Sequence, residues 1–244
     1  MENQKILGII PARGGSKSVP KKNIKELAGK PLLAWTIEEA KKSKYIDRVI
    51  VSTDDEETAG IARQYGAEVP FMRPREISQD LSTDIEFLTH ALDFLKENEN
   101  YEPDIVVLLR TTSPLKTAQH IDKGIELLIN TPDADAVRPI VESPKHPYKM
   151  WKIADDKKWI EPFLSKDFTG MDEPYNSNRQ LLPDVYVPTG AMDVMHLKTI
   201  RELKSTSGKK TAYFTMKPEE SVNIDNLMDF KVAEVLMKER KKNN

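Results

Sequence analysis

The residues best suited to chemistry in this sequence lie near its start, in the stretch Ile9–Ile24. A short apolar run ends at Pro11, and the adjacent glycines Gly14 and Gly15 and a serine follow it. The same stretch holds four cations, which are Arg13, Lys17, Lys21 and Lys22. Glycines let the backbone turn sharply and approach a ligand with its N–H groups, and such groups combined with clustered cations suit a polyphosphate.

The pattern of this loop excludes two common nucleotide-binding motifs. It has no Gly-Lys-Ser/Thr after a four-residue gap, as a Walker A loop requires, and it lacks the GxGxxG of dinucleotide-binding folds. A glycine pair followed by a single lysine would indicate only a tight turn with a solvated side chain. Four cations beside the end of a first strand favour phosphate binding instead.

Composition limits the class of protein. The 244 residues can bury one substantial core, and 39% hydrophobic and 31% charged residues are typical of a soluble globular protein. A net charge of −2 argues against a general nucleic-acid binder. The sequence has no cysteine and no run of ~20 apolar residues, which excludes disulfides, thiolate metal sites and a membrane span. We therefore expect a cytoplasmic protein without a signal peptide, with no membrane or nucleic-acid partner.

Strand and helix patterns alternate along most of the chain. Strands are expected at 6–10, 48–52, 68–71, 104–109, 136–141, 191–195 and 211–216, and helices at 31–43, 56–65, 84–97, 118–130, 197–204 and 226–241. This order predicts an α/β fold with a Rossmann-like, mainly parallel sheet and helices on both faces. Ligands of such sheets bind outside the carboxyl ends of the strands. The polar clusters 13–22, 53–55 and 110–116 fall at those ends.

The pattern changes between about residues 143 and 188. This segment is rich in proline, has no helical period, and holds Trp151 and Trp159, two of the three tryptophans. We interpret it as an antiparallel arm inserted in a single domain that spans residues 1–244. Apolar residues on a thin arm need cover, and a second subunit would supply it. The alternative is that the arm folds back on its own chain.

Further blocks follow the opening stretch in order. They read KPLLAWTIEEA, VIVSTDD, RPREISQD, LLRTTSPLK, NRQLLPDVYVPTGA and VNIDNLMDF. Together with IIPARGGSKSVPKKNI, they make most of the chain resemble the acylneuraminate cytidylyltransferases, the CMP-sialic acid synthetases. The resemblance implies a Rossmann-like domain, a homodimer joined through the arm, and a Mg²⁺-dependent reaction. In that reaction CTP and a nine-carbon keto-sugar acid give the CMP-sugar and pyrophosphate.

The resemblance also assigns the nucleotide half of the site. Catalysis falls to Lys17, Arg13 and Asp225, with Lys17 offsetting charge on the triphosphate. Asn23 would reach the ribose or base, and Arg73 the pyrimidine edge. The full nucleotide-binding set is Arg13, Gly14, Gly15, Ser16, Lys17, Lys22, Asn23, Arg73, Asp80, Ser82 and Asp84.

Two of these assignments have plainer alternatives. Arg73 could form a surface ion pair. Asp80, Ser82 and Asp84 could cap the helix that follows them, as could Thr83.

The metal site departs from the family pattern. The family presents an Asp-x-Asp pair before the last helix, and this chain has Asn223-Ile224-Asp225. Asp225 keeps the main Mg²⁺ ligand, whereas Asn223 offers an amide oxygen without charge. Asp225 could also cap the last helix.

The acceptor pocket departs further. By the resemblance the sugar-binding residues are Arg110, Thr111, Ser113, Lys149, Arg179 and Thr189. Arg110 stands where glutamine is common, and Val187, Thr189 and Asp193 stand where arginine, asparagine and tyrosine are usual. Lys149 and Arg179 match the family and suit a sugar carboxylate. We predict an α-keto sugar acid, with sialic, legionaminic, pseudaminic, deaminated and eight-carbon acids all open.

Two other functions compete with this one. The first is a nucleotidyltransferase for another sugar such as Kdo, although TTSPLK has no acid where that group has an acidic motif. The second is a non-catalytic nucleotide- or sugar-binding regulator of the same fold, which only Asn223 favours. The four histidines show no metal-ligand spacing, and we assign them no catalytic role.

Overall fold

The computed structural model describes residues 4–243 and the side chains of residues 4–240. The chain forms two compact units. The sheet unit comprises Met1–Ile140 and Pro188–Asn244, and the insert comprises Val141–Val187. Every residue predicted for the nucleotide site belongs to the sheet unit, whereas Lys149 and Arg179 belong to the insert. In residues 4–243 no helix is long and apolar enough to cross a bilayer.

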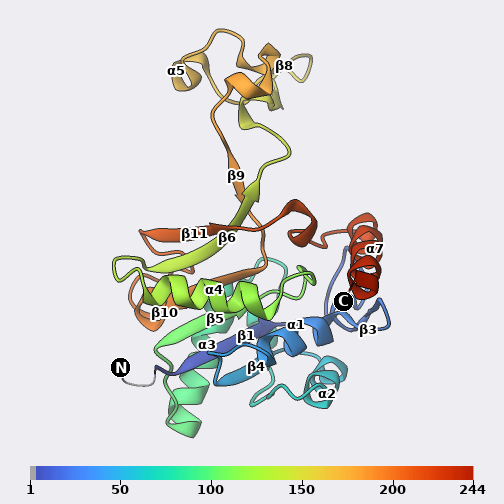
Figure 1. Cartoon of the computed structure of the whole chain (residues 1–244), viewed down its shortest axis with the longest axis vertical. Coiled ribbons are helices and arrows are strands. Elements are labelled where there is room, and N and C mark those ends of the chain that lie inside the picture. The colour runs from blue at the N-terminus through green and yellow to red at the C-terminus, as the bar shows by residue number, and fades with distance from the viewer. Residues whose placement is uncertain (1–3, 244) are drawn as a thin grey trace. The chain divides into compact units, whose positions relative to one another are not determined.

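The core of the sheet unit is a mixed, mainly parallel sheet (Figure 1). Its order is β11-β6-β10-β5-β1-β4, and β9 pairs with β6. β1 runs parallel to β4 and β5, and β6 runs parallel to β11, whereas β10 is antiparallel to both β5 and β6. The bounds are β1 Ile6–Pro11, β4 Arg48–Ser52, β5 Ile105–Leu109, β6 Ala136–Glu142, β9 Tyr186–Pro188, β10 Met192–His196 and β11 Thr211–Thr215.

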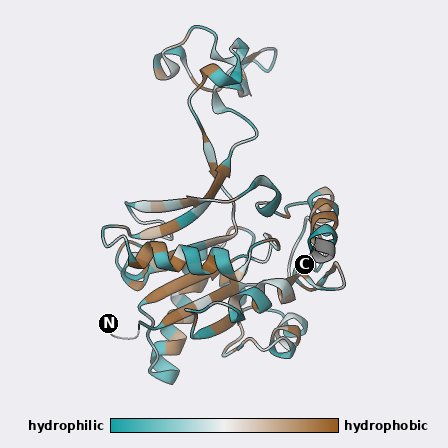
Figure 2. Cartoon of the chain, in the orientation of Figure 1, coloured by the Kyte–Doolittle hydropathy of each residue, from teal (hydrophilic) through white to brown (hydrophobic). Residues whose placement is uncertain are grey.

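Helices cover both faces of this sheet, as the alternation predicted. One apolar cluster joins α1, α2 and α4 to one face, and a second joins α3 and α6 to the other. Figure 2 shows the apolar residues concentrated on the strands and on the inner stripes of these helices. The bounds are α1 Leu32–Lys41, α2 Glu56–Gln64, α3 Asp84–Glu99, α4 Ala118–Ile129 and α6 Leu197–Arg201. The predicted fold class is therefore confirmed.

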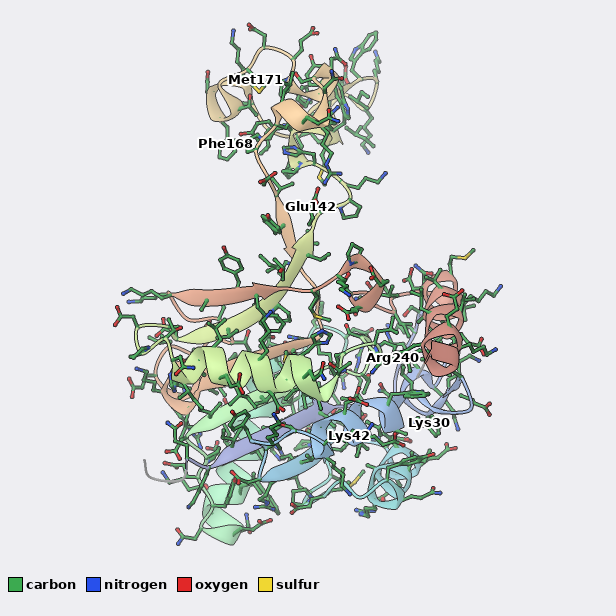
Figure 3. All side chains as sticks on the ribbon, in the orientation of Figure 1. Lys30, Lys42, Glu142, Phe168, Met171 and Arg240 are labelled. Carbon is green, nitrogen blue, oxygen red and sulfur yellow. The ribbon has the colours of Figure 1, made fainter. Side chains whose placement is uncertain are left out.

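A third apolar cluster packs the last helix, α7 (Leu227–Asn243), against the β2–β3 hairpin. Besides α7 residues it contains Val19 of the opening loop, Leu115 of the loop after β5, and Ile224 of the segment before α7, all at most 4% exposed. Arg240 of α7, labelled in Figure 3, donates from Nη1 to the carbonyl of Leu115 at 3.2 Å. The cluster thus fixes three loops that are distant in sequence. The hairpin strands are β2 Glu26–Leu27 and β3 Lys30–Pro31.

Three predicted elements differ from the structure. Residues 68–71 form no strand, because Glu68 makes only an isolated bridge to Ile50 and Pro70 has no N–H to continue a ladder. Pro31 is not the first helical residue: its ψ of 141° makes it the N-cap of α1. The helix expected to reach residue 204 ends at Arg201.

The insert has its own small framework. β7 (Trp151–Ile153) and β8 (Ile160–Pro162) form an antiparallel pair, and α5 (Lys166–Thr169) follows. Single-turn 3-10 helices occur in both units, at Lys22–Ile24, Arg75–Ile77, Pro147–Lys149, Pro174–Asn176, Arg179–Leu181 and Pro218–Glu220.

Two glycines offer a paired test of this backbone. Gly208 has a φ of +66°, and a Cβ there would lie 2.2 Å from Cβ of Asp135. We expect Gly208→Ala to lower the free energy of unfolding by about 1–3 kcal/mol. Gly60 lies within α2 with no neighbour within 4 Å of an added Cβ, so Gly60→Ala should raise it by about 0.5–1 kcal/mol. Urea denaturation measures the free energy of unfolding of both variants. Changes of the same sign in the two variants would contradict the description of Gly208.

Candidate functional site

A cavity of about 540 Å³ opens beyond the carboxyl ends of β1 and β5. This is the edge at which parallel sheets bind ligands. The walls come from three separate blocks of sequence, which are residues 11–23, 73–87 and 110–112. Among the predicted residues, those that line it are Arg13, Ser16, Lys17, Lys22, Asn23, Arg73, Asp80, Ser82, Asp84, Arg110 and Thr111.

The two glycines of the opening loop do not line this cavity. The N–H of Gly14 donates to Oδ1 of Asp54 at 2.9 Å, and a Cβ on Gly14 would come within 2.7 Å of Cβ of Asp55. Glycine is therefore needed at 14 for a close approach to the loop after β4. Its N–H is already engaged within the protein. An added Cβ on Gly15 would have no atom within 4 Å, so this position faces open space.

Asp80 joins the two cations that we expect to bind phosphate. Its Oδ1 accepts from Nη1 of Arg13 at 2.9 Å, and its Oδ2 forms an ion pair with Lys17. The hydrogen bond from Lys17 and then that from Arg13 lower the pKa of the Asp80 carboxyl. A carboxylate thus occupies the position between Arg13 and Lys17. Lys17 is otherwise largely solvated, with 83% of its side chain exposed.

The cap of α3 is neither Asp80 nor Asp84. Thr83 is the N-cap residue, and it forms a capping box with Glu86. The hydroxyl of Ser82 accepts instead from the N–H of Gln79 at 2.9 Å. The carboxylates of Asp80 and Asp84 are consequently free to face the cavity.

Asn23 and Lys22 join the opening loop to its neighbours. Asn23 donates from Nδ2 to the carbonyl of Arg13 at 2.9 Å and accepts from the hydroxyl of Thr111 at 2.6 Å. Lys22 donates from Nζ to the carbonyl of Ile224 at 2.8 Å. Burial lowers the pKa of Lys22, although the nearby carboxylate of Asp225 opposes this. Both side chains therefore fix loops to one another as well as lining the cavity.

Arg73 is a buried side chain, which excludes the surface ion pair considered from the sequence. Its residue is 6% exposed, and its guanidinium donates from Nε to the hydroxyl of Ser52 at 2.9 Å and from Nη2 to the carbonyl of Ser52 at 2.6 Å. The group lies 4.5 Å from the ring centre of Phe87, and burial lowers its pKa to about 10. Nη1 has no hydrogen-bond partner in residues 4–240, so its donors remain for a ligand in the cavity.

Arg110 and Asp193, two positions that depart from the family pattern, contact one another. Arg110 lies between Oδ2 of Asp193 at 2.7 Å and Oδ2 of Asp84 at 2.6 Å. Arg138 pairs with the second oxygen of Asp193, whose side chain is 3% exposed. Burial lowers the pKa of Arg110, but Asp193 and Asp84 outweigh it, and the pKa is raised. The two unusual residues thus belong to one network, in which Arg110 and Arg138 are the cations and Asp84 and Asp193 are the carboxylates. Sequence reasoning missed Arg138.

A second polar cluster lies beside the cavity rather than in its walls. The buried hydroxyl of Ser113 lies 3.3 Å from the carbonyl oxygen of Thr189 and 3.4 Å from Oδ1 of Asn223. Nδ2 of Asn223 donates to Oδ2 of Asp225 at 2.8 Å. Of the residues predicted to bind sugar, Ser113 and Thr189 therefore serve here as links between loops.

The cap of α7 is Asn226, whose Oδ1 accepts from the N–H of Met228 at 2.8 Å and that of Asp229 at 3.1 Å. Asp225 is therefore not the cap. Its carboxylate contacts the Asn223 amide and stays available as a ligand. In residues 4–240 no group of three or more acidic or histidine side chains could hold a metal. One carboxylate and one amide oxygen fit Mg²⁺ only where substrate phosphates and water complete its shell.

Lys149 and Arg179 make their contacts within the insert. Arg179 donates to Oε1 of Glu142 at 2.8 Å and to the carbonyl of Pro144 at 3.2 Å. Lys149 donates to the carbonyl of Ser177. The cavity in the sheet unit is lined without either of them.

Lys116 was not singled out from the sequence, where it reads as the end of a polar loop. Its side chain is fully buried. Nζ donates to the carbonyls of Arg110 and Ser113 at 2.6 and 3.0 Å and to the hydroxyl of Thr36 at 2.9 Å. Burial lowers its pKa to about 7. The only sequence signal is a lysine between the apolar Leu115 and a helix start.

Comparison with known proteins identifies relatives over nearly the whole chain. Residues 7–239 match the family model described as Cytidylyltransferase. The chain is 34% identical over 229 residues to N-acylneuraminate cytidylyltransferase of Escherichia coli O18:K1:H7, covering 94% of this chain but only 51% of that protein. The chain thus spans about half the length of that relative.

Two relatives of matching length are also similar. The chain is 34% identical to CMP-N,N'-diacetyllegionaminic acid synthase of Legionella pneumophila, covering 96% of both chains. It is 30% identical to pseudaminic acid cytidylyltransferase of Campylobacter jejuni, covering 96% of this chain and 97% of that one. Among solved structures, a CMP:2-keto-3-deoxy-manno-octonic acid synthetase complexed with CTP superposes with a TM-score of 0.69 at 15% identity, covering 97% and 99% of the chains. That likeness shows the fold.

The Arg110–Asp193 contact can be tested by a double-mutant cycle. Arg110→Gln and Asp193→Asn each leave a buried charge with fewer partners, so the double variant should lose less stability than the sum of the two. We expect a coupling of about 1–3 kcal/mol in the free energy of unfolding. The exposed pair Lys152–Glu161, at 3.2 Å, is the control and should give below about 1 kcal/mol. Additive effects at Arg110 and Asp193 would contradict the contact.

The burial of Lys116 predicts that the stability of the protein depends on pH. Its pKa is lowered from 10.5 to about 7 in the folded protein, so between these values the unfolded chain holds a proton that the folded chain has released. The free energy of unfolding must then rise with pH across this window, by at most about 1.4 kcal/mol per pH unit. Relative to Lys116→Met, the wild type should gain stability from pH 7 to 10 and show a constant difference below pH 7. Denaturation at a series of pH values measures this, and a flat difference throughout would contradict it.

Proposed function

This chain belongs to the cytidylyltransferase family, and we propose that it transfers CMP from CTP to a nonulosonic, sialic-acid-like keto-sugar acid with release of pyrophosphate. One observation carries the proposal. Residues predicted for phosphate and base recognition, from the opening loop and from the block at Arg73, line one cavity at the ligand-binding edge of the sheet. The relatives of matching length, named for legionaminic and pseudaminic acids, support the acceptor class.

The reaction is attack by a sugar hydroxyl on the α-phosphate of CTP. Its catalysis depends on positioning and on neutralising charge rather than on covalent chemistry. Arg13 and Lys17 would bind the triphosphate by exchanging the carboxylate of Asp80 for phosphate oxygens. Lys17 has the freedom to follow the charge as it moves to the leaving pyrophosphate, because its side chain is solvated.

The base would be read by Arg73. Its two bonds to Ser52 hold the guanidinium against Phe87, and the unpaired Nη1 supplies donors for the carbonyl and ring nitrogen of a pyrimidine edge. These contacts already hold the Arg73 side chain in one conformation. Binding of the base would therefore cost little further side-chain entropy.

Asp225, with Asn223 beside it, would hold Mg²⁺ together with the triphosphate. The ion when bound neutralises phosphate charge. Lys22 fixes the segment through the carbonyl of Ile224, between these two ligands, and so sets their distance from the opening loop. The chain's own contribution is one carboxylate, one amide and their placement.

The Arg110–Asp193 network limits how Arg110 can bind the acceptor. Arg110 lines the cavity, but two carboxylates already balance its charge. A sugar carboxylate would compete with Asp84 for it. We infer that Arg110 contributes a shared donor rather than a free cation to the sugar carboxylate.

We also propose that the protein is a homodimer joined through the insert. Large apolar side chains on the insert remain exposed, with Trp159 at 71% and Leu181 at 72%. Burying this apolar surface lowers the free energy, and a second copy of the chain could bury it in a symmetric dimer. Analytical ultracentrifugation of the whole protein tests this, and a monomer at micromolar concentration would contradict it.

The activity is tested by pyrophosphate release from each nucleoside triphosphate with a panel of eight- and nine-carbon keto-sugar acids, with and without Mg²⁺. We expect turnover with CTP and a nine-carbon acid, dependent on Mg²⁺. Lys17→Ala should lower kcat by about 10²–10³ while the protein stays folded, because a group aimed at transition-state charge is lost.

Lys21→Ala is the matched control, since Lys21 lies in the same loop but pairs with Glu57 and does not line the cavity. It should keep turnover within about threefold of the wild type. Absence of turnover with every nucleotide would refute the proposed function. Full activity of Lys17→Ala would refute the role of Lys17 alone.

A further inference from the structure

Lys116 is a fully buried lysine, with three hydrogen bonds and no carboxylate among its partners. A lysine ammonium has three donors, and each is used once: for Thr36 on α1 and for the carbonyls of Arg110 and Ser113. The charged groups near it are Glu39 of α1 and Arg110. Burying such a group without an ionic partner is costly, so its hydrogen bonds must be well made.

The two carbonyls bracket the segment that forms one wall of the cavity. Arg110, Thr111 and Thr112 line the cavity, and the bonds from Lys116 close this segment at its start and just after its end. The segment is irregular, so its carbonyls need partners outside any helix or strand. The third bond connects it to Thr36, within a helix packed on the sheet. Lys116 thereby anchors the segment 110–113 to helix α1.

We propose that Lys116 is a positioning residue for the sugar-acid half of the site. It holds the segment 110–113 so that Arg110 meets Asp84 and Asp193 and so that Ser113 meets Asn223. Lys116 itself does not line the cavity. The inference rests on the proposed function, whose acceptor it concerns.

The same geometry predicts which substrate is affected. The nucleotide-binding side has bonds of its own, from Asn23 to Arg13, from Arg73 to Ser52 and from Lys22 to Ile224. It also touches the segment 110–113 at two points, because Thr111 donates to Asn23 and Ile224 donates to the carbonyl of Thr112. The wall formed by 110–113 has Lys116 beneath both of its ends. Loss of the amine should therefore disturb acceptor binding more than CTP binding.

The test compares Lys116→Met, which keeps the volume and removes the donors, with Lys44→Met, an exposed lysine in the turn after α1. Steady-state kinetics are measured with CTP and the acceptor that turns over in the panel. We expect Lys116→Met to raise the acceptor KM about tenfold or more and the CTP KM less than about twofold, because small displacements of a binding wall have large effects. Lys44→Met should change neither.

A second variant keeps the proposal testable if Lys116→Met does not fold. Thr36→Val removes only the anchor hydroxyl. It should raise the acceptor KM in the same direction by about twofold to fivefold. An unchanged acceptor KM in a folded Lys116→Met, or in Thr36→Val when the first variant fails to fold, would overturn the proposal. Equal rises in both KM values would do so as well, since a general structural defect gives that result.

Failure of the proposed function is recognised separately, because the wild type would then show no turnover. In that event amide hydrogen exchange in residues 110–113 decides whether Lys116 positions the loop. Exchange at least about tenfold faster in Lys116→Met, with α1 and α4 unchanged, supports the positioning role. Unchanged exchange in the segment overturns it.

Discussion

The site depends on one packing constraint: three polar loops must be held together by apolar side chains of their own. Val19, Leu115 and Ile224 each come from a different loop, and all three enter the cluster beneath α7. Polar loops gain little from one another in water, since their hydrogen bonds exchange with solvent. Burying one apolar residue from each gives a steady driving force of about 25 cal/mol per Å². The residues that face the cavity are thereby left free to vary in chemistry.

Three of the five cations that line the cavity are already matched by carboxylates. Asp80 pairs with Arg13 and Lys17, and Asp84 and Asp193 pair with Arg110. Unpaired cations held this close would repel one another, so the carboxylates stabilise the arrangement. In the proposed function, an anionic substrate would replace these carboxylates as the partner of the cations. The exposed Asp80 is suited to such exchange, whereas the buried Asp193 is suited to fixing geometry.

Local patterns predicted most of the fold correctly for a physical reason. The strands β1, β4 and β5 are continuous apolar runs and the helices α1 to α4 have amphipathic periods, and both patterns report burial directly. Residues 68–71 show where the pattern fails. The run is apolar enough for a strand, but Pro70 cannot donate, and Phe71 is buried against His90 and Phe94 of α3 instead. In so short a segment, a strand paired in a sheet and a loop packed on a helix have the same apolar sequence pattern.

The sequence by itself determined the fold class, the loop that we expect to bind phosphate and the residue types around it, because those follow from local spacing and from blocks in a fixed order. Only the tertiary structure decided what these side chains contact. It showed that Arg110 and Asp193, 83 positions apart, form one network, that Asn226 rather than Asp225 caps α7, and that Lys116 lies buried beneath a cavity wall. Contacts of this kind depend on how the crossovers of the sheet bring distant loops together, and no local pattern records that.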